Sequence, residues 1–334
     1  MQIISLPELI KQEKIELGHL QSIGKPIYTQ RDYLEYPLGG FIPGDVLTIA
    51  AGAGVGKSYE LNILKNRIMN RDINPESEDF VFLDISLEMR VLTLMVRQLS
   101  QEMSISKKEI FFNRFTQDQQ ERAKVIVDNW ADKRFYVCQS ETTAESFYAA
   151  TKQFCEEHKD KKAVFISCDH LALLSGGSGK KTSIIEDFLG RVNDLKLQYK
   201  NTYFILISQL NSDYFNRAGE KDRNAEPKPN DLFYSSSIFH LSSYVVVKTN
   251  PSKLGIAEYS KVKPDRYPHL DKYFTQPDNK GKVSFYTDDL LFYHLLKNRE
   301  ADPGYVDIFV EEIKPFTRTE SWVIPTVLPD FLKK

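Results

Sequence analysis

Hydrophobic residues along the first two thirds of the chain alternate between two patterns. Short runs of consecutive apolar residues, typical of strands buried on both faces, are followed by segments in which apolar residues recur at helical spacing. The runs predict strands at residues 46–50, 79–86, 135–139, 163–169 and 203–209. The periodic segments predict helices after residue 58 and at residues 88–100, 116–131, 142–157 and 183–199. This alternation predicts an α/β fold, in which a mostly parallel, twisted sheet is flanked by helices on both faces.

The last third of the chain has a different pattern. Residues 244–248, 293–297 and 306–312 have strand patterns with little helix between them. They predict antiparallel strands added at the C-terminal end of the sheet. Residues 251–290 are rich in Pro, Lys, Asp and Tyr, and we expect them to form an insertion on the surface.

A single domain is expected over residues 31–314, with a segment at each end outside it. Residues 1–30 form the N-terminal arm, with an amphipathic helix that packs either on its own core or on a neighbouring subunit. The apolar positions of this helix are Leu6, Leu9, Ile10 and Leu17. Residues 33–44 predict a turn-rich lead into the first core strand, and residues 315–334 are expected to form a C-terminal tail.

The first expected strand runs into a loop of small residues that ends in Lys-Ser at the start of a helix. Strand, small-residue loop and helix together are typical of a phosphate-binding loop, whose backbone N–H groups converge on phosphate oxygens. Lys57 is then expected to reach the β- and γ-phosphates, and the Ser58 hydroxyl to bind Mg²⁺. The nucleotide-binding residues are Ala51, Gly52, Ala53, Gly54, Val55, Gly56, Lys57 and Ser58. The alternative is a glycine-rich turn that binds no ligand.

Three polar residues end or follow other expected strands, where ligands of a parallel sheet bind. Asp169 is expected to hold Mg²⁺ through water, although an acid there also suits a helix cap. Glu88 can polarise the attacking water, although Glu is also common in the first turn of a helix. The amide of Gln209 can contact a γ-phosphate. The sequence assigns no role to His170, since an isolated His is more often a packing or hydrogen-bonding residue.

Composition and net charge limit the classes of protein to which the chain can belong. The chain has 334 residues, of which 41% are hydrophobic, and its net charge is −2. These values exclude a disordered chain and a basic coat over the whole surface, so any nucleic-acid site must be local. Cys138, Cys155 and Cys168 are expected to be reduced thiols. Since neither a signal peptide nor a membrane span is recognisable, we expect a cytoplasmic protein with no membrane partner.

Four motifs in order carry a resemblance to a known family. They are the loop at residues 51–58, Ser-Leu-Glu-Met at 86–89, Ser-Gln-Leu-Asn at 208–211 and Lys-Asn-Arg at 297–299. Over roughly residues 33–312 the chain resembles the C-terminal ATPase domain of DnaB-type replicative DNA helicases, which have a RecA-like P-loop core. The resemblance implies ATP and Mg²⁺ as cofactors, with Glu88 as catalytic base and Gln209 as γ-phosphate sensor. It also implies that Lys297 and Arg299 reach the nucleotide of a neighbouring subunit in a homo-hexameric ring.

The sequence also departs from this family. Where the family has Ile-Asp-Tyr-Leu-Gln-Leu, residues 168–173 read Cys-Asp-His-Leu-Ala-Leu, and Tyr234, Phe239 and His240 replace acidic and polar residues. By this resemblance we expect a phage- or plasmid-like helicase that lacks the family's N-terminal, primase-interacting domain. Residues 1–24 then correspond to the family's linker helix, which docks on the adjacent subunit.

Two loops are expected to contact single-stranded DNA, at residues 176–182 and 212–230. Lys180, Lys181 and Arg217 are the candidate residues, although lysine pairs are also common in solvated loops. The favoured function is an ATP-dependent replicative helicase that forms a ring and translocates on single-stranded DNA. A primase or a helicase loader is a further expected partner.

Two alternative functions stay open at this point. A RecA-type recombinase shares the phosphate loop and both acids, but tends to have Lys where this chain has Arg299. A RecA-like ATPase without unwinding activity, acting as a loader, a regulator or a virion-associated assembly protein, is favoured by the altered residues 239–240 and the unusual insertion.

Overall fold

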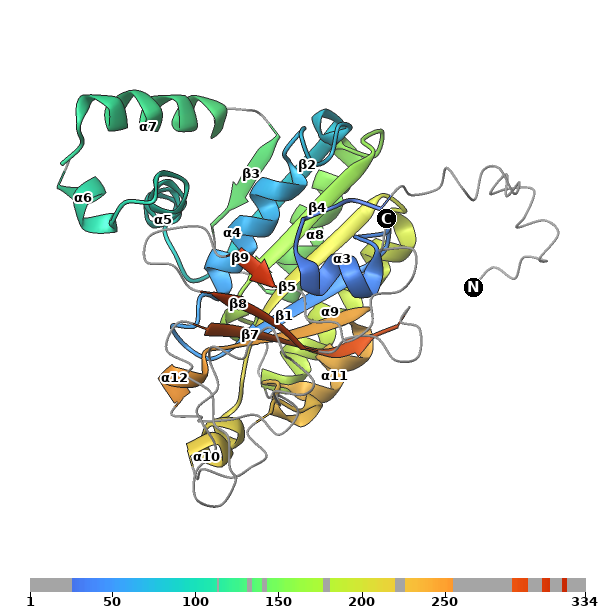
Figure 1. Cartoon of the computed structure of the whole chain (residues 1–334). Helices are drawn as coiled ribbons and strands as arrows, with labels where there is room; N and C mark the ends of the chain where they lie inside the picture. Colours follow the sequence, from blue (N-terminus) through green and yellow to red (C-terminus); the bar gives the residue numbers. More distant parts are fainter. Residues whose placement is uncertain are drawn as a thin grey trace, which may run out of the picture.

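The computed structural model describes residues 26–112, 114–130, 134–139, 143–176, 181–219, 226–254, 290–299, 308–312 and 320–322. A nine-stranded sheet in the order β3-β2-β4-β5-β1-β6-β7-β8-β9 runs through the molecule (Figure 1). Its parallel strands are β1 (Val46–Ala51), β2 (Phe80–Ser86), β3 (Phe135–Cys138), β4 (Ala163–Asp169), β5 (Thr202–Gln209) and β6 (Tyr244–Thr249). The antiparallel strands are β7 (Leu290–Asn298), β8 (Ile308–Glu312) and β9 (Glu320–Trp322). Both the parallel sheet and its antiparallel extension are confirmed.

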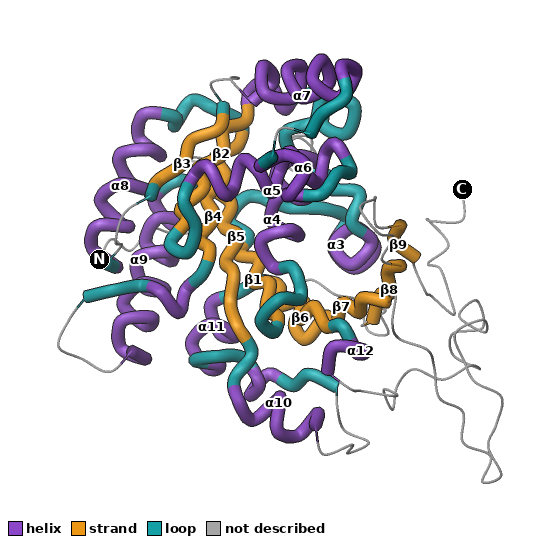
Figure 2. The backbone as a smooth tube through the Cα atoms, turned by 90° about the vertical axis from the view of Figure 1, so that its left-hand side faces the viewer, coloured by secondary structure: helices purple, strands orange, loops and turns teal. Residues whose placement is uncertain are grey.

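Helices cover both faces of this sheet, as Figure 2 shows. One face carries α3 (Asp32–Leu38) and α4 (Lys57–Ile68), and the other carries α8 (Ala144–Glu157), α9 (Lys181–Gln198) and α11 (Ser235–Leu241). The remaining helices are α5 (Val91–Met103), α6 (Lys107–Phe111), α7 (Gln117–Trp130), α10 (Ser212–Gly219) and α12 (Pro251–Leu254). Of these, α5, α6 and α7 pack on one another around Leu99, Met103 and Ile105. Three short 3₁₀ helices are η1 (Ser77–Asp79), η2 (Leu171–Leu173) and η3 (Pro229–Asp231).

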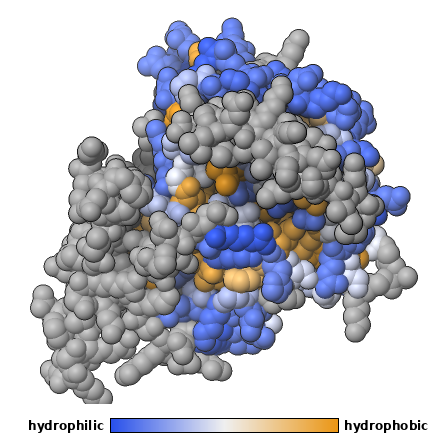
Figure 3. Space-filling model, turned by 90° about the vertical axis from the view of Figure 1, so that its right-hand side faces the viewer, coloured by the Kyte–Doolittle hydropathy of each residue, from blue (hydrophilic) through white to orange (hydrophobic). Residues whose placement is uncertain are grey.

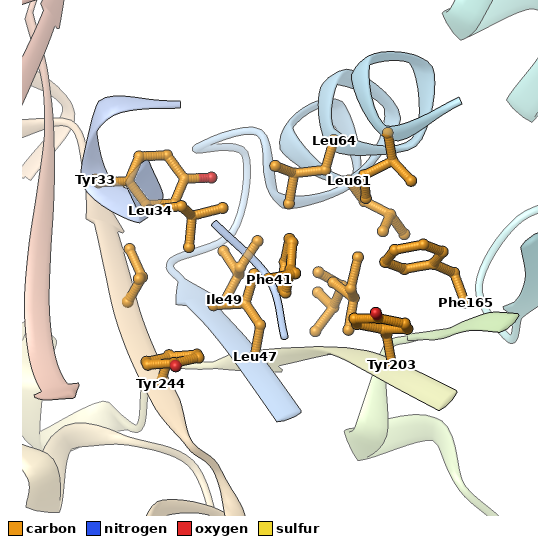
Figure 4. Close-up of a cluster of buried hydrophobic side chains, with 14 of the residues drawn as sticks. Tyr33, Leu34, Phe41, Leu47, Ile49, Leu61, Leu64, Phe165, Tyr203 and Tyr244 are labelled. Carbon is orange, nitrogen blue, oxygen red and sulfur yellow. The ribbon is translucent and has the colours of Figure 1, made fainter. Parts of the chain in front are cut away.

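The core follows the period-two alternation of the strands. In β1, Leu47 and Ile49 face the layer that contains α3 and α4, where Leu61 and Leu64 of α4 point toward them (Figure 4). The neighbouring residue Val46 belongs to the cluster under α8 and α9. Burial of both faces explains why these strands read as continuous apolar runs. On the face seen in Figure 3, the described surface is mainly hydrophilic and its hydrophobic areas are central.

Four buried charges connect the phosphate-loop helix to the C-terminal strands. Arg31, Glu60, Lys248 and Glu311, which we call the buried charge cluster, are each 0–1% exposed. Glu60 lies 2.8 Å from both the Arg31 Nε and the Lys248 Nζ, and Arg31 donates to Glu311 at 2.7 and 2.9 Å. Two buried tyrosines, Tyr33 and Tyr293, each donate a hydroxyl hydrogen bond of 2.8 Å to Glu60. The cluster therefore joins four segments of the chain with no net charge.

Several local predictions failed, among them the expected loop at residues 212–230, which contains α10 and the start of η3. The expected turn at residues 33–44 contains part of α3, whose residues Tyr33 and Leu34 are buried. The sequence did not reveal this helix, because seven residues are too few to show a helical period. Helix α8 begins at Ala144 with Thr143 as its N-cap, two residues after the predicted start, and α5 begins at Val91 instead of residue 88. The expected tail contains β9.

Other predictions lie largely outside the described residues. These are the N-terminal helix, the insertion beyond residue 254 and Lys180. Within the described ranges, none of the helices combines the length and the apolar character needed to cross a membrane. Cys138, Cys155 and Cys168 are free thiols, as predicted.

Candidate nucleotide site

The phosphate loop connects the carboxyl end of β1 to the first turn of α4. Gly54 and Gly56 adopt left-handed conformations, with φ of +71° and +94°, which glycine adopts without steric cost. Gly56 is the N-cap of α4, so the positive end of the helix dipole faces the loop. This geometry is that of an anion site and confirms the predicted strand, loop and helix.

Lys57 lies inside the loop. Its Nζ donates hydrogen bonds of 3.2 Å to the carbonyl oxygens of Ala51 and Gly52. Burial lowers the pKa of Lys57, while the nearby charges of Asp169 and Glu88 act in the opposite direction. The ammonium group is thus held inside the loop by two backbone carbonyl oxygens, in the part of the motif that binds phosphate oxygens in such loops.

Ser58 and Asp169 meet at the other side of the loop. The Ser58 Oγ donates a hydrogen bond of 2.6 Å to Oδ2 of Asp169, and Oδ1 of Asp169 is buried without a hydrogen-bond partner among the described residues. Burial raises the pKa of Asp169 to about 6. A hydroxyl beside a carboxylate with an unused oxygen fits Mg²⁺, which takes oxygen ligands and keeps several waters. The described residues contain no group of three or more side chains of His, Cys, Asp or Glu that could hold a metal alone.

Strand register brings the predicted polar residues to the same edge of the sheet. Ser86 is paired with Asp169, and Ala51 with Gln209. The turn after β2 is fixed to β4 by a hydrogen bond of 2.8 Å from the Leu87 N–H to the Asp169 carbonyl. Glu88 follows in that turn, and its side chain is half exposed. Glu88, Asp169 and Gln209 therefore lie beside the phosphate loop, as predicted.

Two residues that the sequence did not single out also lie at this edge. The Nε2 of His170 is 3.0 Å from Nε2 of Gln209 and 3.8 Å from Oε2 of Glu88. Burial lowers the pKa of His170, which favours the neutral ring. Lys253 of α12 donates a hydrogen bond of 2.7 Å to the Gly54 carbonyl. The signal for His170 was its position directly after a strand-end acid; Lys253 lies in a short helix that has no sequence pattern.

Lys297 and Arg299 lie at the opposite end of the sheet. They sit at the end of β7, where Asn298 is paired with Tyr244 at the start of β6, and the Arg299 N–H bonds to the Ser243 carbonyl. Both side chains donate to the His240 carbonyl near the end of α11. The structure thus does not bring them to the phosphate loop of their own chain.

Two of the predicted DNA-binding residues, Lys181 and Arg217, lie within the described ranges, and each side chain bonds within its own chain. Lys181 begins α9 and donates to the Leu174 carbonyl. Arg217 of α10 forms a two-bond ion pair with the buried Asp231, at 2.8 and 2.5 Å. Contact of these residues with DNA stays a prediction.

Comparisons with known proteins give one family match and several solved structures with a similar fold. The family model described as "DnaB-like helicase C terminal domain" matches residues 27–260. A solved structure titled "ATPase Domain of G40P" has a TM-score of 0.68 at 15% identity and covers 95% of this chain and 99% of its own. Another, titled "The Structure Of A DnaB-Like Replicative Helicase And Its Interactions With Primase", has a TM-score of 0.64 at 16% identity. The aligned region covers 94% of this chain and 66% of that one. No match was found among curated proteins.

Proposed function

The chain belongs to the DnaB-like helicase family through its C-terminal ATPase domain, and on that premise we propose that it is the motor subunit of a ring that uses ATP to translocate on single-stranded DNA. Membership makes the chain an ATP-hydrolysing helicase with a RecA-like core. The ring, the DNA strand and the residues that act on each are what we propose here.

The main support for the proposal is that the phosphate loop and the two cationic residues Lys297 and Arg299 lie at opposite ends of the sheet. The phosphate loop follows Ala51 at the carboxyl end of β1, whereas Arg299 is bonded to Ser243 beside Val46 at the other end. Five residues of strand span about 17 Å, which is more than an arginine side chain can cross. Lys297 and Arg299 therefore suit the nucleotide of a neighbouring copy, where a cation stabilises the charge that develops on the transferred phosphoryl group.

The residues at the nucleotide edge have distinct roles in this proposal. Backbone N–H groups of the loop and Lys57 bind the β- and γ-phosphates, while Ser58 and Asp169 hold Mg²⁺. Bound Mg²⁺ supplies charge neutralisation between the two phosphates. Glu88 orients the attacking water and accepts its proton, for which its half-exposed carboxylate is suitably open. Gln209 detects the γ-phosphate by hydrogen bonding.

A physical link runs from the nucleotide edge to the expected DNA loops. The strand that ends in Gln209 leads into α10, and Phe215 of α10 lies so close to the loop that a Cβ on Gly52 would be 3.1 Å from its ring. A shift of the loop on nucleotide binding would therefore displace α10, which carries Arg217. This contact supports coupling between ATP and the segment at residues 212–230.

A forked-DNA unwinding assay with both tail polarities tests the proposal. We expect ATP-dependent unwinding of one fork, and an ATPase rate that rises with single-stranded DNA. Binding to oligo-dT with a nonhydrolysable ATP analogue should weaken steeply as salt increases, because counterions are released from the phosphates. Binding without unwinding, with long filaments instead of closed rings in electron micrographs, would favour a recombinase. Hydrolysis with no DNA binding would favour an assembly ATPase.

A further inference from the structure

His170 lies where the proposed base and the proposed sensor meet. Its Nε2 is 3.0 Å from the Gln209 amide and 3.8 Å from the Glu88 carboxylate. The imidazole is 7% exposed, whereas the Glu88 side chain is 50% exposed. One buried ring nitrogen thus lies within reach of both groups, and the ring is better fixed than the carboxylate.

The other ring nitrogen indicates which tautomer is present. Nδ1 of His170 is buried and has no hydrogen-bond partner in the part of the chain that the structure describes. A proton on Nδ1 would leave a buried donor unsatisfied, which costs more than an acceptor without a donor. We therefore assign a proton to Nε2 of the ring. A glutamine amide can turn its oxygen toward this N–H, so Gln209 is one acceptor and Glu88 is the other.

We propose that His170 is a positioning residue, which links Glu88 to Gln209 by donating its Nε2–H to one or the other. This inference rests on the function proposed above. Without a γ-phosphate, the N–H is donated to the Gln209 oxygen. When a γ-phosphate engages the Gln209 amide, the N–H is released to the Glu88 carboxylate, which moves about 1 Å to reach hydrogen-bond distance. The base is thus oriented for water activation only when there is a γ-phosphate to hydrolyse.

The proposed role of His170 predicts that two similar substitutions at this position have different effects on ATP hydrolysis. The amide of His170→Gln reaches the position of Nε2, whereas the amide of His170→Asn reaches only that of Nδ1. We expect His170→Asn to lower kcat for ATP by about 10²-fold, since a misplaced base has an effect of that order. His170→Gln should retain kcat within about fivefold, and KM should stay within about threefold in both. Titration with a fluorescent ADP analogue checks that both variants fold and bind nucleotide.

A second measurement asks whether His170 acts through the base. In single-turnover hydrolysis, His170→Asn should lower the rate by less than about threefold in a Glu88→Gln background, because the carboxylate that it positions is already absent. Independent losses in the two backgrounds would contradict the link.

The possible results separate the two proposals. If the wild-type protein hydrolyses ATP and the Asn and Gln variants lose the same fraction of kcat, the role of His170 is wrong and the proposed function stands. If the wild-type protein does not hydrolyse ATP with or without DNA, the proposed function fails and the role of His170 fails with it.

Discussion

Two groups of polar side chains each include a residue from the first turn of α4, but they differ in burial and in how their charges are paired. The buried charge cluster contains Glu60, and each of its charges has a close partner of opposite sign. The nucleotide edge, formed by Lys57, Glu88, Asp169, His170 and Gln209, has a half-exposed carboxylate and two buried atoms without partners among the described residues, Oδ1 of Asp169 and Nδ1 of His170.

We infer that the buried charge cluster stabilises the fold and that the charges at the nucleotide edge bind a ligand. Buried polar groups are normally satisfied, so Oδ1 of Asp169, unsatisfied within the described residues, marks a place beside the phosphate loop where a cation or a water completes the site. The other cluster is structural, because each of its four buried charges lies within about 3 Å of a charge of opposite sign. Glu60 holds α4 against β6 and β7 through Lys248 and Tyr293, while Lys57, three residues earlier, is directed into the loop.

A matched pair of substitutions tests this contrast most strongly. Glu88→Gln should reduce kcat for ATP by 10² to 10⁴-fold, on the order of a lost general base, and leave the free energy of unfolding unchanged. Glu60→Gln should destabilise the fold by about 3–5 kcal/mol, because buried Lys248 loses its charged partner and buried Arg31 loses one of its two. ATPase rates and urea unfolding of both variants provide the comparison. Equal losses of unfolding free energy in the two variants would show that Glu88 contributes to the stability of the fold as much as Glu60 does.

Acid should affect the buried charge cluster in a defined direction. Burial alone would raise the pKa of Glu60, but Arg31 and Lys248 outweigh it and hold the pKa at about 2. A carboxylate with a depressed pKa contributes stability above its unfolded pKa, near 4.5, and that stability is lost as the pH falls toward 2. Between pH 5 and pH 3, we expect wild-type protein to lose about 2 kcal/mol more unfolding free energy than Glu60→Gln. Parallel pH profiles of the two proteins would contradict this.

We expect the smallest effect on unfolding free energy from an exposed ion pair, which also serves as the control for the substitution and pH experiments. Lys162 and Glu76 lie 3.2 Å apart, and each side chain is about half exposed. Since solvent screens such pairs, Lys162→Ala should change the unfolding free energy by less than about 0.5 kcal/mol. A larger loss, measured in the same urea titrations, would mean that charge removal alone destabilises this protein.

The sequence predicted the parts of this molecule whose signals are local. The apolar strands and the loop from Ala51 to Ser58 each have a pattern within ten residues, and the sheet edge then follows from the rule that parallel strands place their carboxyl ends together. The roles of Glu88 and Gln209 needed the family resemblance, because a single acid or amide after a strand is not specific.

The remaining features depend on contacts between distant segments. Arg31 and Glu311 are 280 residues apart, and in the sequence each has the appearance of a solvated charge. Lys248 reads as the polar end of a strand, although it is 1% exposed. His170 could not be assigned a role, since its neighbours Glu88 and Gln209 come from other strands. Such partnerships arise from the packing of the sheet and leave no periodic trace.

The central claim is that each ATP site is completed by a second copy of the chain. Arg299→Ala and Lys57→Ala proteins should each lack DNA-stimulated ATPase activity when pure. Mixed in equal amounts before ring assembly, about a quarter of the interfaces should join an intact phosphate loop to an intact arginine, so the mixture should recover about that fraction of wild-type activity. A mixture as inactive as its components, or a pure Arg299→Ala protein with full activity, would contradict the claim.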